Sequence, residues 1–318
     1  MDSYAVKESD INPQVRSLAL NTELHIAGEA LYLGLRRYHI TTCEESADLF
    51  YFLYQTTIGI ERLMKINYRL IEARQDSVPE MKFRHNLTKL HDAILGLTNT
   101  VSPENEKGFI KMLTEFYKDS RYANLDNSSS SGVTPQQLFI NYTASLGLKT
   151  DTKVRLGQII QGVIKSQYTI LKDMCTKLGV FTDELSYGSN GGKLFYATQI
   201  YTDIFMLYSE EDRAYNEFIT ALLAFNKESR DLRTDIRTTP LGESVASMHV
   251  LTTDIYTELE TLEIIRSIRG GVIPQDLVDL VNDTYNNLDA TKERSEKEMR
   301  LGIYDALVGE NLIEAVDE

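Results

Sequence analysis

The sequence has no tryptophan and only two cysteines, Cys43 and Cys175, among its 318 residues. The cysteines lie far apart and lack the paired spacing of a zinc site, so neither a disulfide framework nor a structural zinc is expected. No apolar run approaches the ~18 residues of a membrane-spanning helix. The N-terminal stretch is polar and mixed in charge, unlike a signal peptide. These absences predict a cytoplasmic protein with no membrane partner.

Positive charge is also in short supply, and the deficit is uneven along the chain. The 33 Lys and Arg stand against 47 Asp and Glu, a net charge of −14. Residues 1–150 contain 16 Lys and Arg against 18 Asp and Glu, whereas residues 151–318 contain 17 against 29. Residues 62–91 are locally basic, with seven Lys and Arg against three Asp and Glu. An acidic chain repels nucleic acid at long range, but this basic stretch suits either a phosphate site or a solvated helix face.

Apolar residues recur at three- and four-residue steps through most of the chain, the pattern of amphipathic helices. Gly59, in the middle of one such helix, allows another helix to approach closely. Residues 124–136 read as a loop that ends in a Thr134-Pro135 capping signal. Strand-like stretches are short and isolated, so the predicted fold is all-α. The expected helices cover 23–38, 42–72, 80–97, 151–178, 193–225, 244–268 and 275–307, with one more opening at Ser102 as its N-cap.

The segment KFRHNLTKLH, residues 82–91, holds the most informative polar residues. Arg84 and His91 are seven residues apart, so in a continuous helix they project from nearly the same face. His85 and Asn86 follow Arg84 directly, and Glu61 is on the preceding helix, where it can face this segment. The group combines a permanent cation, an imidazole that titrates near neutral pH, and hydrogen-bonding neighbours.

This arrangement resembles the HEPN superfamily of helical bundles. The hallmark of that superfamily is an Arg, usually followed by a polar residue, with a His after about four to six intervening residues. Residues 49–65 resemble the long helix before that motif, and FYKDSRY, residues 116–122, resembles the aromatic and basic segment that often closes it. The resemblance covers roughly residues 22–145. It implies a tail at 1–21, a HEPN-like bundle at 22–145 and a second, acidic helical domain at 146–318.

The resemblance implies a metal-independent endoribonuclease, of a kind that serves as a toxin or an effector of antiviral defence. The RNA 2′-hydroxyl would attack the adjacent phosphate, with His91 as the base because its reference pKa is near 6.5. Arg84 would stabilise the phosphate charge, and His85 or Asn86 would add a hydrogen bond, with Glu61 orienting the group. No cofactor and no metal are implied. Such proteins usually form homodimers in which two motifs share one cleft that binds the RNA substrate.

Two other functions fit the same residues. Many members of the superfamily carry an HNL-type segment without being nucleases, and HNLTKL fits that version, with His91 incidental. The chain is then a non-catalytic interaction module that dimerises and docks a protein or nucleotide partner, with the acidic second half as a docking surface. A third reading is an acidic mimic of nucleic acid, against which the Lys and Arg scattered among the acids argue. Structural roles compete for each residue, such as a salt bridge from Arg84 to Glu61 or Glu80.

Several remaining features favour structural interpretations. SNGGKLF, residues 189–195, lacks the Gly-Lys-Ser/Thr ending of a phosphate loop, so a loop between helices is expected. His25 and Glu29 share a helix face but have no evident further ligands for a metal. The 18 tyrosines are expected mainly as half-buried packing residues, with Tyr51, Tyr54 and Tyr68 in a core or dimer seam.

Overall fold

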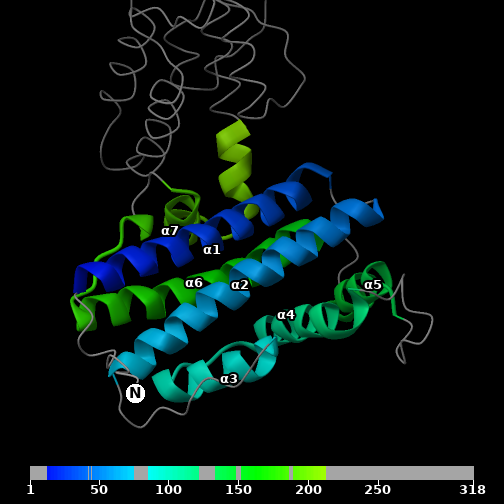
Figure 1. The fold of residues 1–318 in the computed structure, drawn as a ribbon. Helices are drawn as coiled ribbons and strands as arrows, with labels where there is room; N and C mark the ends of the chain where they lie inside the picture. Colours follow the sequence, from blue (N-terminus) through cyan, green and yellow to red (C-terminus); the bar gives the residue numbers. More distant parts are fainter. Residues whose placement is uncertain are drawn as a thin grey trace, which may run out of the picture. The chain divides into compact units, whose positions relative to one another are not determined.

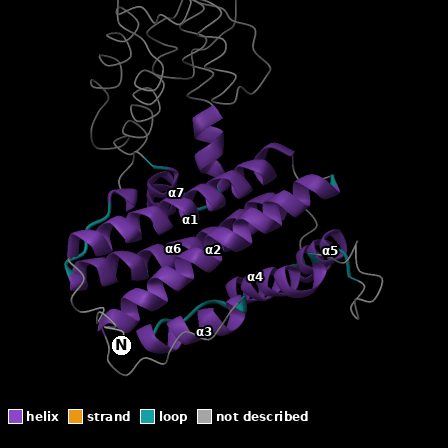
Figure 2. Cartoon of the chain, viewed as in Figure 1, coloured by secondary structure: helices purple, strands orange, loops and turns teal. Residues whose placement is uncertain are grey.

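The structure of the chain is a computed structural model that describes residues 13–41, 43, 45–74, 85–121, 133–147, 152–185 and 189–212. Within these ranges every regular element is a helix and none is a strand (Figure 2). The all-α prediction is therefore confirmed for this part of the chain. None of the described helices combines the length and the apolar character needed to cross a membrane.

Three long helices and several short ones make up the first compact unit, which Figure 1 shows as a ribbon. The long helices α1, α2 and α6 run beside one another, and α3, α4 and α5 follow the side of α2 away from α1 (Figure 1). The elements are α1 (Pro13–Thr41), α2 (Ser46–Arg74), α3 (Leu87–Thr98), α4 (Glu104–Glu115), the π-helix η2 (Phe116–Ser120), α5 (Pro135–Ser145), α6 (Thr152–Leu178), the 3₁₀ turn η3 (Asp183–Leu185) and α7 (Asn190–Ile200).

Gly59 of α2 lies against the backbone of α1, as the sequence predicts. A Cβ atom built on Gly59 would lie 2.9 Å from the carbonyl oxygen of Ala27 and 2.5 Å from Cγ of Leu31. Backbone atoms cannot yield to such an overlap, so only glycine permits this approach of the two helices. The same contact buries Leu31 and Ile60 almost completely.

Helix α6 packs on α2 through an apolar stripe and one buried amide pair. The side-chain amide of Asn67 donates 2.9 Å hydrogen bonds to both the backbone and the side-chain oxygen of Gln167. Both residues are buried, so each bond replaces one lost to water. The stripe on α6 consists of side chains no more than 4 % exposed: Leu156, Ile159, Ile160, Val163, Ile164, Tyr168, Leu171 and Met174.

The chain divides into two compact units, Met1–Met206 and Leu207–Glu318. The structure thus places α6 and α7 in the first unit, whereas the sequence assigned them to an acidic domain starting at 146. The physical reason is the fit of α6 on α2 and of α7 on α1, where a Cβ on Gly28 would lie 2.6 Å from Cα of Gly191. Of the second unit only residues 207–212 are described, and they are helical. The helices expected at 244–268 and 275–307 lie outside the described residues.

The capping predictions have mixed outcomes. Thr134 caps α5 as expected, because its hydroxyl accepts a 3.2 Å hydrogen bond from the Gln137 amide and Pro135 opens the helix. Ser102 does not cap α4. Pro103 holds the N-cap position, and the Ser102 hydroxyl donates to the Glu106 carboxylate at 2.9 Å.

Candidate functional site

The helix that carries His91 begins at Leu87 rather than near residue 80. Asn86 is its N-cap, and the side-chain oxygen of Asn86 accepts a 3.1 Å hydrogen bond from the Lys89 amide. A second free amide of this first turn, that of Thr88, donates to the Thr114 hydroxyl of α4 at 3.1 Å. Both bonds satisfy amides that a helix start leaves unpaired. Asn86 therefore has a structural role here and not the catalytic role predicted for it.

His85 lies just before this cap, next to Glu61 of α2. Its Nδ1 atom is 3.1 Å from Oε1 of Glu61, and the same oxygen is 2.7 Å from Nζ of Lys65. The His85 side chain is 59 % exposed, whereas that of Glu61 is only 8 % exposed. A nearly buried carboxylate thus holds an exposed imidazole and an ammonium together. The prediction that Glu61 faces the 84–91 segment is confirmed at His85.

Aromatic rings flank this group along the junction of α2 and η2. The ring of His85 lies 5.0 Å from that of Tyr117, centroid to centroid. Tyr117 stacks on Tyr54 with centroids 6.4 Å apart, and Tyr54 stacks on Phe50 at 5.8 Å. The guanidinium of Arg121 lies 4.2 Å from the centroid of Tyr117. We call His85, Glu61, Lys65, Tyr117, Tyr54 and Arg121 the His85 cluster.

The wider turn of η2 sets the position of Tyr117. A π-helical turn inserts an extra residue into a helix, and such turns are frequent at functional sites. Here the turn leaves Phe116 fully buried, while Tyr117 and Arg121 are half-buried. The cluster therefore has a rigid base and an accessible face.

His91 lies on the opposite, inward side of α3. It is 2 % exposed, and burial lowers the pKa of its imidazole, with Asp92 raising and Lys107 lowering that pKa to a smaller extent. A base that attacks an RNA hydroxyl must reach the substrate, and this side chain is enclosed by its own bundle. In this structure His91 is a core residue.

Arg84 lies outside the described residues. The argument that placed Arg84 and His91 on one face required both to belong to a single helix, and α3 starts after Arg84. The structure thus brings together two of the predicted site residues, His85 and Glu61, and assigns Asn86 to the cap and His91 to the core.

The weaker sequence features also have structural roles. His25 pairs with Glu184 at 3.4 Å, and Glu29 accepts a 2.8 Å hydrogen bond from Asn190. Ser189 caps α7, so SNGGKLF is the opening of a helix rather than a loop. Across the described ranges no three His, Cys, Asp or Glu side chains are grouped to hold a metal.

Lys65 and Tyr117 were not among the predicted site residues. The basic stretch 62–91 includes Lys65, and the resemblance singled out FYKDSRY, but neither observation indicates which side chains meet. The contact depends on the packing of α2 against α4 and η2, which no local pattern encodes. Comparisons with family models, with curated proteins and with solved structures find no match to this chain.

Proposed function

We propose that the chain binds single-stranded RNA at the His85 cluster and cleaves it without a metal ion. The observation that carries the proposal is the exposed His85 imidazole, whose Nδ1 is 3.1 Å from a nearly buried Glu61 carboxylate. An imidazole that donates Nδ1–H to a carboxylate presents Nε2 as a base with a fixed orientation. His85 takes the place that the sequence gave to His91.

The chemical step requires only groups within reach of this histidine. Nε2 of His85 accepts the proton of an RNA 2′-hydroxyl, and the resulting oxygen attacks the adjacent phosphorus. The bond from phosphorus to the 5′-oxygen breaks, the leaving oxygen takes a proton from water, and a 2′,3′-cyclic phosphate remains. Lys65, beside His85, stabilises the added charge on the phosphate oxygens.

The rings beside His85 suit the recognition of unpaired bases. Aromatic side chains stack on any base, and such stacking contributes about 1–3 kcal/mol per base. Tyr54 and Tyr117 form a stacked pair at 6.4 Å, with Arg121 at the edge of the platform. The locally basic stretch 62–91 offsets part of the repulsion expected from a net charge of −14.

The HEPN resemblance adds the biological setting of this proposal. It favours a homodimer in which two His85 clusters share one RNA cleft, and a role as a toxin or in antiviral defence. The acidic second half is then a surface for a protein partner. Light scattering tests the dimer, because a mass near 36.2 kDa at all concentrations would rule out a shared cleft.

The activity test uses single-stranded RNA in EDTA with four proteins purified in parallel. Wild type is expected to produce cyclic phosphate ends, and His85→Ala to cut at least about 100-fold more slowly, in line with the contribution of general bases. Arg84→Ala tests the remaining HEPN motif residue. The control is His25→Ala, an exposed histidine of α1 that should cut like wild type. Equal cutting by wild type and His85→Ala would indicate a contaminating nuclease and reject the proposal.

The second candidate is the non-catalytic interaction module. The burial of His91 and the use of Asn86 as a helix cap favour it, because both leave the HNL segment with structural tasks. It predicts that RNA or a nucleotide binds at the His85 cluster but is never cut. Binding without cleavage in the same assay, lost in Tyr117→Ala, would select this alternative.

A further inference from the structure

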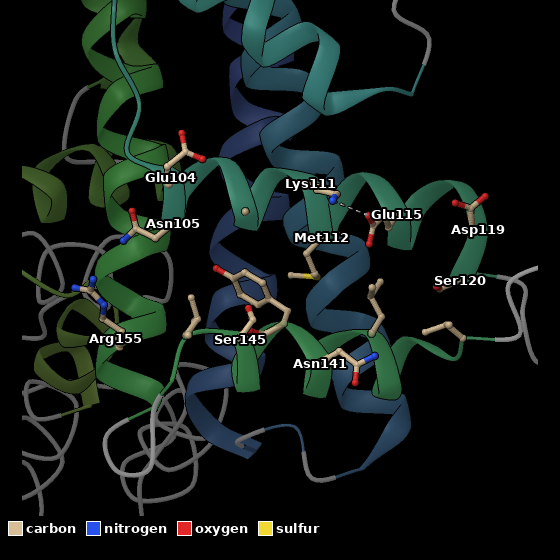
Figure 3. A pocket seen from close by; sticks show the side chains of 15 residues that line it. Glu104, Asn105, Lys111, Met112, Glu115, Asp119, Ser120, Asn141, Ser145 and Arg155 are labelled. Atoms are coloured by element: carbon tan, nitrogen blue, oxygen red, sulfur yellow. Dashed lines mark hydrogen bonds and ion pairs between the residues drawn. The ribbon is translucent and has the colours of Figure 1, made fainter.

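A second hollow lies between α4 and α5, away from His85. It has a volume of about 850 Å³ and receives Asp119 and Ser120 from η2 and Arg155 from α6 (Figure 3). Pockets of about 300–1,000 Å³ accommodate small organic ligands. We call this hollow the α4–α5 groove.

One polar atom inside the groove has no partner. Tyr142 of α5 lines it and is 8 % exposed, and its hydroxyl makes no hydrogen bond to any described residue. The ring itself is held by packing on Phe109, with centroids 6.0 Å apart. Buried polar atoms are nearly always paired, and leaving one unpaired costs stability. An unpaired hydroxyl that faces a cavity indicates a group that is supplied by a ligand.

The walls of the groove combine apolar surface with amide groups. Met112 and Leu138 are buried side chains that face it from the two helices. Asn105 and Asn141 line it as well, and each side-chain oxygen already accepts a hydrogen bond, from the Glu106 amide and from Gln137 respectively. Their NH₂ groups suit carbonyl oxygens. This combination matches a peptide, which has carbonyl groups along its backbone and apolar side chains.

The two ends of the groove differ in charge. Arg155 lies at one end and Asp119 at the other, with Glu115 next to Asp119 (Figure 3). Arg155 uses one donor for Gln158 at 3.1 Å, and its remaining donors suit a carboxylate. Its charge also acts on Tyr142, where it opposes the rise in pKa that burial causes. Lys111, at 3.8 Å from Glu115, offsets part of the acidic end.

We propose that the α4–α5 groove binds a short linear peptide with free ends, its carboxylate at Arg155 and the Tyr142 hydroxyl and its amine at Asp119 and Glu115. The volume suits a peptide of about three residues. The site is separate from the His85 cluster, so the inference stands whether or not the chain cleaves RNA.

The test titrates the tripeptide Ala-Leu-Ala into the full chain and measures binding by calorimetry. The peptide with free ends is expected to bind at least about tenfold more tightly than its N-acetylated, C-amidated form, because the blocked form lacks both terminal charges. Arg155→Gln should weaken binding of the free peptide by about tenfold as well. Equal affinity for the two peptides, or no heat of binding for either, would overturn the proposal.

Tyr142→Phe separates a ligand-binding hydroxyl from a structural one. It should bind the peptide about fivefold more weakly and yet melt at a higher temperature without peptide, because it removes an unpaired buried hydroxyl. The matched control is Tyr51→Phe, an exposed tyrosine of α2 outside the groove, which should leave binding unchanged. Wild-type affinity together with a lower melting temperature in Tyr142→Phe would show that the hydroxyl serves the fold only.

Discussion

The start of α3 and its inner face differ sharply although both belong to one short stretch of sequence. His85, before the helix, has a side chain that is 59 % exposed and lies beside Glu61. His91, in the second turn, is 2 % exposed and packs in the core. The difference shows that the residue type alone does not predict chemistry, because one imidazole is available to a substrate and the other is enclosed.

The position of the cap causes this difference. Asn86 ends the non-helical approach, so His85 is free of the helical period and reaches across to α2. From Leu87 on, every third or fourth residue faces inward, and His91 falls on the face of Leu87 and Leu90. The predictions below test this contrast from the largest expected effect to the smallest.

Replacing the core histidine should have the largest effect on stability. His91→Ala is expected to lower the free energy of unfolding by about 2–4 kcal/mol, because it leaves a cavity in the bundle. His85→Ala should change it by less than about 1 kcal/mol, since its ion pair is mostly solvated. Urea denaturation of both variants checks the contrast, and equal losses would contradict the separation of core and surface roles.

The same histidine should make stability depend on pH. Burial lowers the pKa of His91 below its ordinary value of 6.5, so the unfolded chain binds a proton more readily than the folded one. The stability it supports is complete above about pH 6.5 and decreases as the pH falls below that value, by at most ~1.4 kcal/mol per pH unit. Denaturation midpoints from pH 7.5 to 5.5 should therefore fall more steeply for wild type than for His91→Leu. Parallel profiles would argue against the buried neutral imidazole.

Removing the helix cap should have a smaller effect. Asn86→Ala deletes the acceptor of the Lys89 amide and should cost about 1 kcal/mol, whereas Asn86→Ser keeps a capping oxygen and should cost a few tenths of that. Thermal unfolding measures both variants. If Asn86→Ala also misplaces His85, RNA cleavage should fall in Asn86→Ala and persist in Asn86→Ser. A loss of cleavage in both variants at unchanged stability would instead support the catalytic role that the sequence suggested for Asn86.

Much of the architecture of the described residues follows from local patterns. The apolar spacing predicted the helices, and the Thr134-Pro135 signal predicted the start of α5. Gly59 predicted a close helix contact, which α1 supplies. Each of these predictions uses only backbone geometry and near neighbours, so each is readable from a single sequence.

The candidate site was less readable. The pairing of Glu61 with the 84–91 segment was expected, but the sequence assigned catalysis to His91 because it extended the helix back to residue 80. Competing start signals within a few residues of each other decide a helix boundary, and the Asn86 cap prevailed here. The 145/146 boundary failed to separate α6 from the bundle for a similar reason, since the contact of Asn67 with Gln167 joins residues a hundred positions apart.

The sequence by itself determined that the described chain is helical, where most helices lie and that basic and aromatic residues surround one histidine-rich segment. Only the tertiary structure decided which histidine faces solvent, that Lys65, Glu61, His85 and Tyr117 meet, and that Tyr142 opens onto a groove. Helical periods are set by bonds between residues four apart, whereas these meetings depend on how whole helices pack.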